Sequence, residues 1–179
     1  VFVYTNYPTA ELFINGKSYG KQSKNNSSLK SRYRLMWMDA VYEPGEVKVV
    51  AYNKDGKAVA EKTVRTAGKP HHIELVSNRN ELTADGKDLA YVTVKVVDKD
   101  GNLCPTDSRL IHFSVKGAGK FRAVANGDPT NLEQFHLPKM HAFHGMLTAI
   151  VQAGEIAGDL VLTAKASGVK TGTVHLQAK

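Results

Sequence analysis

Cysteine is nearly absent from this chain of 179 residues, since Cys104 is the only one. A single cysteine excludes an internal disulfide, and it fits either a reducing compartment or an exported protein without disulfides. No apolar run approaches the roughly 20 residues of a membrane-spanning helix, so we expect no membrane insertion. The chain also lacks an initial Met and a basic leader, and it opens inside a predicted strand, residues 1–6. We therefore expect a fragment of a longer polypeptide, with any export signal lying upstream.

The short motifs of common active sites are also absent. There is no G-x-S-x-G turn, no Gly-rich phosphate loop and no H-E-x-x-H helix. A glycosidase needs two carboxyl groups roughly 5–10 Å apart with separated pKa values. The Asp and Glu residues here fall at predicted turns, strand edges and solvent faces, and no pair stands out. We therefore predict no catalytic residue, no cofactor and no metal ligand, and thus no enzyme activity in this fragment itself.

Positive charge is present in excess, but its pattern is not that of a nucleic-acid-binding protein. The formal net charge is +7, and residues 1–67 hold 11 Lys and Arg against 6 Asp and Glu. Such an excess could favour acidic partners. The basic residues are not interleaved with stacking aromatic residues, so a solvated surface is the preferred interpretation and no nucleic-acid partner is expected.

The hydrophobic pattern is that of short strands. No segment keeps a 3.6-residue period, whereas alternating runs recur between turn signals every 8–12 residues. This pattern predicts an all-β protein of two tandem immunoglobulin-like β-sandwich domains. The strongest hairpin signal is Asn15-Gly16, and the clearest strand is 89–98. A strand at 35–42 should bury Trp37, because Met36 and Met38 flank it.

The boundary between the two domains is predicted within residues 63–75. Gly68 and Pro70 interrupt the strand pattern there, which divides 1–67 from 68–179. The first domain is near the lower size limit for a domain that has no disulfide or metal site to stabilise it. A strand removed upstream, which would leave it truncated at its N-terminus, would account for this size.

A long irregular loop begins at AVANGDPT, residues 123–130, and holds the candidate contact residues. Asn126 and Asp128 can form a tight turn that satisfies its own backbone, which is the preferred interpretation, or can meet a ligand or a neighbouring domain. His141 and His144 complete the candidate set. A strand predicted at 142–153 would put these two histidines on opposite faces.

Two segments offer a metal-binding interpretation, and neither is the preferred one. The histidines of FHLPKMHAFHG are not predicted to form a compact zinc site, because Pro138 separates His136 from the other two. The preferred interpretation is that these histidines lie in the loop or at its ends and bind no metal. The DKDGN segment, residues 98–102, resembles the start of a calcium loop but lacks the closing Glu. A β-turn explains its Asp-Gly pair.

Four motifs occur in a fixed order and carry a family resemblance. They are AELFING (10–16), YEPGEVKVVAY (42–52), TAGKP (66–70) and NGDP (126–129). In this order they resemble the C-terminal accessory region of bacterial glycoside hydrolase family 2 enzymes of the β-galactosidase type. The resemblance covers nearly the whole chain.

The resemblance implies a parent glycosidase with a jelly-roll, a sandwich and a catalytic (β/α)8 barrel that holds two glutamates, followed by these modules. No family catalytic residue corresponds to a position in this chain. The implied role is accessory: the domains pack beside the barrel, with other domains of the parent as partners and carbohydrate as a further candidate partner. The implied location is periplasmic or secreted.

Two other functions remain open. One sandwich could be a carbohydrate-binding module that uses exposed aromatic residues, for which Trp37 would have to be exposed. The chain could instead be an immunoglobulin-like repeat segment of a cell-surface adhesin, which would predict further repeats upstream and no barrel.

Overall fold

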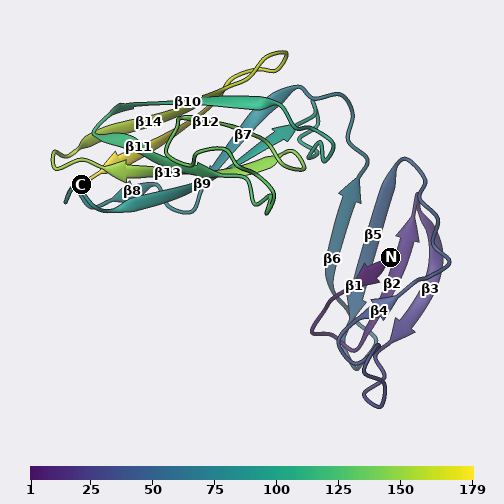
Figure 1. Cartoon of the computed structure of the whole chain (residues 1–179). Coiled ribbons are helices and arrows are strands. Elements are labelled where there is room, and N and C mark those ends of the chain that lie inside the picture. The colour runs from purple at the N-terminus through teal and green to yellow at the C-terminus, as the bar shows by residue number, and fades with distance from the viewer. The chain divides into compact units, whose positions relative to one another are not determined.

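The chain folds entirely into β-strands and loops. The computed structural model describes all 179 residues and contains fifteen strands and no helix. No helix is therefore present that is long and apolar enough to cross a membrane. The chain forms two compact units, Val1–Thr66 and Ala67–Lys179 (Figure 1). The predicted all-β class with two tandem immunoglobulin-like sandwiches is confirmed, and the division lies one residue from the predicted boundary.

The first unit is a four-stranded antiparallel sheet with a short two-stranded ladder packed on one face. The large sheet has the order β3-β2-β5-β6 and the small one pairs β1 with β4. Its core holds Leu12 and Trp37, with smaller apolar residues around them. The strands are β1 (Phe2–Val3), β2 (Thr9–Ile14), β3 (Lys17–Ser23), β4 (Leu35–Met36), β5 (Glu46–Tyr52) and β6 (Ala58–Arg65).

The Asn15-Gly16 hairpin forms as predicted between β2 and β3. Both residues have positive φ, 48° and 79°, as a two-residue turn of this kind requires. The Asn15 side chain also accepts the Glu46 backbone N–H at 2.8 Å and donates to the Pro44 carbonyl at 3.2 Å. The turn is therefore fixed to the loop that precedes β5.

Trp37 is buried as predicted, but the strand predicted around it is wrong. Its side chain is 1% exposed and its indole N–H donates to the Gly20 carbonyl at 3.1 Å. The strand β4 ends at Met36, and Met38 and Tyr42 are exposed. The backbone bends at Met38 and Asp39, so the residues after Trp37 leave the ladder that β4 forms with β1.

The second unit is a sandwich of a five-stranded and a four-stranded sheet. The orders are β12-β10-β14-β15-β8 and β11-β13-β9-β7, and the inward-facing residues of both sheets form one core. In β9, Ala90, Val92, Val94 and Val96 are all fully buried, as the alternation predicted. The strands are β7 (His72–Ser77), β8 (Glu81–Leu82), β9 (Leu89–Val97), β10 (Leu110–Gly117), β11 (Gly119–Ala125), β12 (Lys139–His141), β13 (Met146–Ala153), β14 (Gly158–Lys165) and β15 (Gly172–Ala178).

The single strand predicted at 142–153 is wrong, because a turn divides that segment. Phe143 and Met146 exchange two backbone hydrogen bonds of 3.0 Å, and His144 and Gly145 between them have φ of 52° and 73°. This is the geometry of a two-residue hairpin turn, with histidine in the place that asparagine usually takes. The two predicted histidines therefore lie on a short strand and on a turn, not on opposite faces of one strand.

Candidate functional site

The candidate site is the loop of residues 126–138, which joins β11 to β12, together with the strand and turn that follow. Its first part is held by its own side chains. Asn126 accepts the Asp128 backbone N–H at 3.0 Å, and Asp128 in turn accepts the backbone N–H and the hydroxyl of Thr130, both at 2.8 Å. These Thr130 bonds, with a smaller contribution from the charge of His144, lower the pKa of Asp128. The polar residues therefore form the self-satisfied turn that the sequence favoured.

The second part of the loop is tied to β12 through Glu133. Its carboxylate accepts the backbone N–H of His141 at 3.1 Å and lies 3.1 Å from the His141 ring Nδ1. Burial acts to raise the pKa of Glu133, but these hydrogen bonds from His141 outweigh it and the pKa is lowered. From the other side, the Asn126 amide donates to the His141 carbonyl at 2.9 Å. Hydrogen bonds to Asn126 and to Glu133 therefore tie two parts of the loop to His141.

Three of the four predicted residues meet at one open hollow of about 710 Å³. Asn126, Asp128 and His141 line it, together with Glu133. His144 does not line it: its ring packs on Phe143 and its Nδ1 lies 3.2 Å from the Pro105 carbonyl oxygen. Glu133 was not predicted, because its pairing with a residue eight positions away depends on the path of the loop and leaves no spacing signal.

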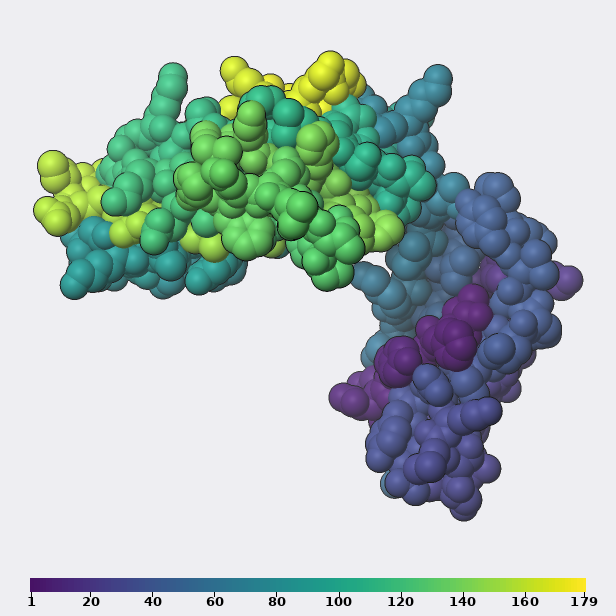
Figure 2. All heavy atoms as spheres, viewed as in Figure 1, coloured from purple at the N-terminus to yellow at the C-terminus, as the bar shows by residue number.

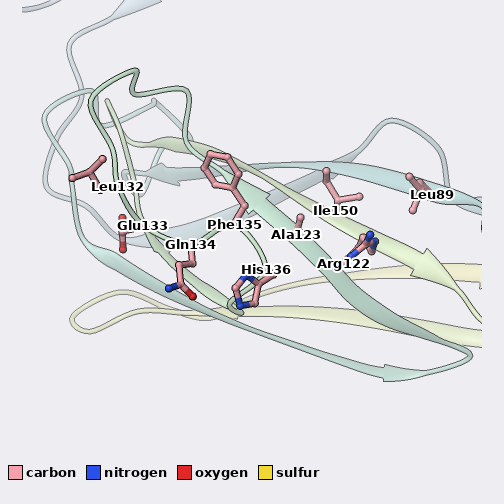
Figure 3. A pocket seen from close by; sticks show the side chains of 9 residues that line it. All are labelled: Leu89, Arg122, Ala123, Leu132, Glu133, Gln134, Phe135, His136 and Ile150. Atoms are coloured by element: carbon pink, nitrogen blue, oxygen red, sulfur yellow. The ribbon is translucent and has the colours of Figure 1, made fainter.

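A second open hollow of about 660 Å³ adjoins the first and shares Leu132 and Glu133 with it (Figure 3). Strand residues Arg122, Ala123 and Ile150 form its floor, and the loop residues Phe135 and His136 form its wall. The Phe135 side chain is 57% exposed. The hollow therefore offers an aromatic ring, a guanidinium and an imidazole at one place.

The histidines do not assemble into a metal site. His136 lines the second hollow, whereas His141 lines the first. No group of three or more His, Cys, Asp or Glu side chains is placed to hold a metal ion. Cys104 is buried, and burial raises the pKa of its thiol, which makes it a poor ligand and a poor nucleophile.

The carboxyl groups with displaced pKa values are all stabilised in their ionised form. For comparison, the general acid of a glycoside hydrolysis needs a raised pKa, so that it still carries its proton near neutral pH. Every carboxyl group whose pKa is displaced in this chain is displaced downward, by hydrogen bonds from backbone N–H groups or from neighbouring side chains such as Ser18 and Arg109. These groups are Glu11, Asp85, Asp88, Asp98, Asp107, Asp128 and Glu133.

The sequence comparisons identify both units. Residues 73–175 match the model of glycoside hydrolase family 2 C-terminal domain 5, and residues 1–60 match a domain of unknown function, DUF4982. The chain belongs to the glycoside hydrolase family 2 C-terminal domain 5 family. The family recognised from the four ordered motifs is therefore confirmed.

The relatives are much longer than this chain. A beta-galactosidase of Bacteroides ovatus, BoGH2A, is 42% identical over 98% of this chain and 20% of its own length. A beta-glucuronidase of Formosa agariphila is 26% identical over 99% of this chain and 18% of its own length. A solved beta-glycosidase from Bacteroides vulgatus matches with a TM-score of 0.89 and 28% identity, over 99% of this chain and 22% of that one. The chain thus spans about a fifth of the length of these relatives.

Proposed function

We propose that this chain is the non-catalytic C-terminal region of a β-galactosidase-like family 2 glycosidase, in which its two sandwiches pack beside the catalytic barrel and stabilise it. The observation that supports this most is coverage: nearly all of this chain matches, but it matches only about a fifth of the Bacteroides ovatus relative.

For the parent, a galactoside is the first substrate to test. The galactosidase relative is 42% identical to this chain, whereas the glucuronidase relative is 26% identical. A β-glucuronide is therefore the second substrate. We further propose that the parent works in the periplasm or outside the cell, as the family resemblance implies; cell fractionation followed by detection of the parent tests this location.

Carbohydrate binding by the chain itself is a second candidate function. Trp37 cannot serve it, because that side chain is 1% exposed. Phe135 could, because its exposed ring lines the second hollow together with Arg122, and an exposed aromatic face can pack against a sugar ring. An adhesin repeat is a weaker candidate, since no feature beyond the sandwich fold supports it.

Removal of this region from the parent tests the supporting role. We expect the parent without residues 1–179 to hydrolyse its glycoside at low temperature with a kcat within about tenfold of the full-length enzyme, but to lose activity faster on warming. The reason is that an apolar interface on the barrel loses its cover. Equal inactivation rates for the two proteins would contradict a stabilising role.

A glycan titration of the Phe135→Ala variant against wild type tests the binding alternative.

A further inference from the structure

The outer face of the five-stranded sheet carries a row of basic side chains across three adjacent strands. His112 in β10 lies directly opposite Lys139 in β12 on one side and directly opposite Lys165 in β14 on the other. Directly opposed residues of an antiparallel pair point to the same side of the sheet. Ile111 and Phe113, the chain neighbours of His112, are buried, so the row points outward, and all three of its side chains are exposed.

Two further rows follow on the same face. The next row carries hydroxyl groups and consists of Ser114, Thr163 and Thr173, in β10, β14 and β15. The third row is basic again at both ends and consists of Lys116, Val161 and His175. Alternate residues of a strand are about 7 Å apart, so about 14 Å separates the two basic rows. Strands β14 and β15 belong to the yellow-green and yellow part of the chain, which reaches the surface of the second unit (Figure 2).

No carboxylate lies in these three rows to balance the lysines. Elsewhere in the same unit, Lys95 lies directly opposite Glu74, and its ammonium nitrogen is 3.1 Å from that carboxylate. Lys116, Lys139 and Lys165 form no salt bridge. Basic side chains placed opposite one another do not stabilise a sheet, so the stability of the sheet does not account for the row.

The positive charge of this face is not a property of the whole unit. Residues 68–179 hold 13 Lys and Arg against 11 Asp and Glu, so the unit is close to neutral. On this side of the sheet, Asp159 and Glu81 come only in the row beyond the third, and Glu81 there pairs with Lys179. The acidic residues are therefore kept away from the three rows, which is the arrangement that an anionic ligand requires.

We infer that this basic face, defined by the three rows, binds an acidic polysaccharide whose sugars carry carboxylate or sulfate groups. The lysine ammonium groups and the imidazole N–H groups of the outer rows bind the anionic groups through charge-assisted hydrogen bonds. The hydroxyl groups of the middle row bind the sugar hydroxyls between them. The exposed face of a sheet can accommodate an extended chain that lies across several strands.

The composition of the face favours an acidic polysaccharide over a nucleic acid. Proteins that bind single-stranded nucleic acids combine positive charge with aromatic rings on which bases stack. The three rows contain no Trp, Tyr or Phe. They offer hydroxyl groups in that place, which bind sugars and do not stack on bases.

Isothermal titration of the 179-residue chain with polygalacturonate, dextran sulfate and uncharged dextran tests the ligand class. We expect an acidic polymer to bind and dextran not to bind, and we expect binding to weaken at least about tenfold between 0.05 M and 0.5 M NaCl. Binding of polygalacturonate alone would assign carboxylates as the ligand groups, and binding of dextran sulfate alone would assign sulfates. Binding of neither, or equally tight binding of a DNA oligonucleotide, would overturn the inference.

Two double variants of equal net charge locate the binding on this face. We expect Lys139→Gln/Lys165→Gln to weaken binding of the acidic polymer at least about tenfold. Lys99→Gln/Lys120→Gln is the matched control, because both lysines are exposed, form no salt bridge and lie outside the five-stranded sheet. Circular dichroism checks that both variants fold. Equal affinities of the two variants would overturn the inference. Hydrolysis is not measured, so such a failure would leave the proposed accessory role standing.

Discussion

Asp98 joins two segments of the second unit that lie far apart in the sequence. Its oxygens accept the backbone N–H groups of Gly68 at 2.7 Å and of Asp100 and Asn102 at 2.9 Å, and the side-chain amide of Asn102. The bond from Gly68, followed by those of Asn102, holds the pKa of Asp98 far below its usual range. The residue both closes the turn after β9 and fixes the start of the unit.

The Asp98→Asn variant should therefore be less stable and should lose part of its pH dependence. The amide has one acceptor oxygen where the carboxylate has two, so the melting temperature of the second unit should fall by several degrees at pH 7. Because the pKa is lowered on folding, the contribution of the carboxylate is complete above about pH 4 and is lost as the pH falls below it. Thermal unfolding between pH 7 and pH 2 measures both effects.

Asp100→Asn is the control for this prediction, since Asp100 lies in the same turn and its side chain makes no hydrogen bond to the protein. Identical melting temperatures and pH profiles for the two variants would contradict the role given to Asp98. The turn itself could be predicted from DKDGN. The bond to Gly68 could not, because it joins residues 30 positions apart and only the folded path brings them together.

Among the elements, the turn between β12 and β13 was not predicted from the sequence. The alternation of apolar residues continues through the turn, because a two-residue hairpin loop preserves the period of two. The segment 142–153 therefore reads as one strand, and His144-Gly145 is a weaker turn signal than Asn15-Gly16. His144 therefore lies on a hairpin turn and not on the face of a strand.

Gly145 should be indispensable to this turn. Its φ is +73°, and an added Cβ would lie 2.3 Å from the Cys104 carbonyl oxygen. Gly127 has a similar φ of +79° but open space around it. We expect Gly127→Ala to cost about 1 kcal/mol from backbone strain alone, and Gly145→Ala about 2 kcal/mol more. Urea unfolding of the two variants measures the difference, and equal costs would show that the close approach is absent.

For the whole molecule, the fold class and the family were predictable, while the details of the site were not. Turn signals and alternation are local, so they predicted the hairpin at Asn15-Gly16 and the buried face of β9. The family followed from four motifs in order. The hydrogen bonds that tie Glu133 and Asn126 to His141 could not be predicted, and neither could the position of Asp128 beside them. They depend on the folded path of the loop, which no spacing rule encodes.

The function proposed for the whole chain predicts that catalysis and this region are separable. The carboxyl groups whose pKa is displaced are all displaced downward, which is the direction that favours the ionised form.

The most direct measurement is hydrolysis of a chromogenic galactoside and a chromogenic glucuronide by the isolated chain and by the full-length parent at equal molar concentration. Circular dichroism would first establish that the isolated chain is folded. We expect turnover by the parent and none by the chain. Turnover by the purified chain, retained after repeated chromatography, would contradict the account.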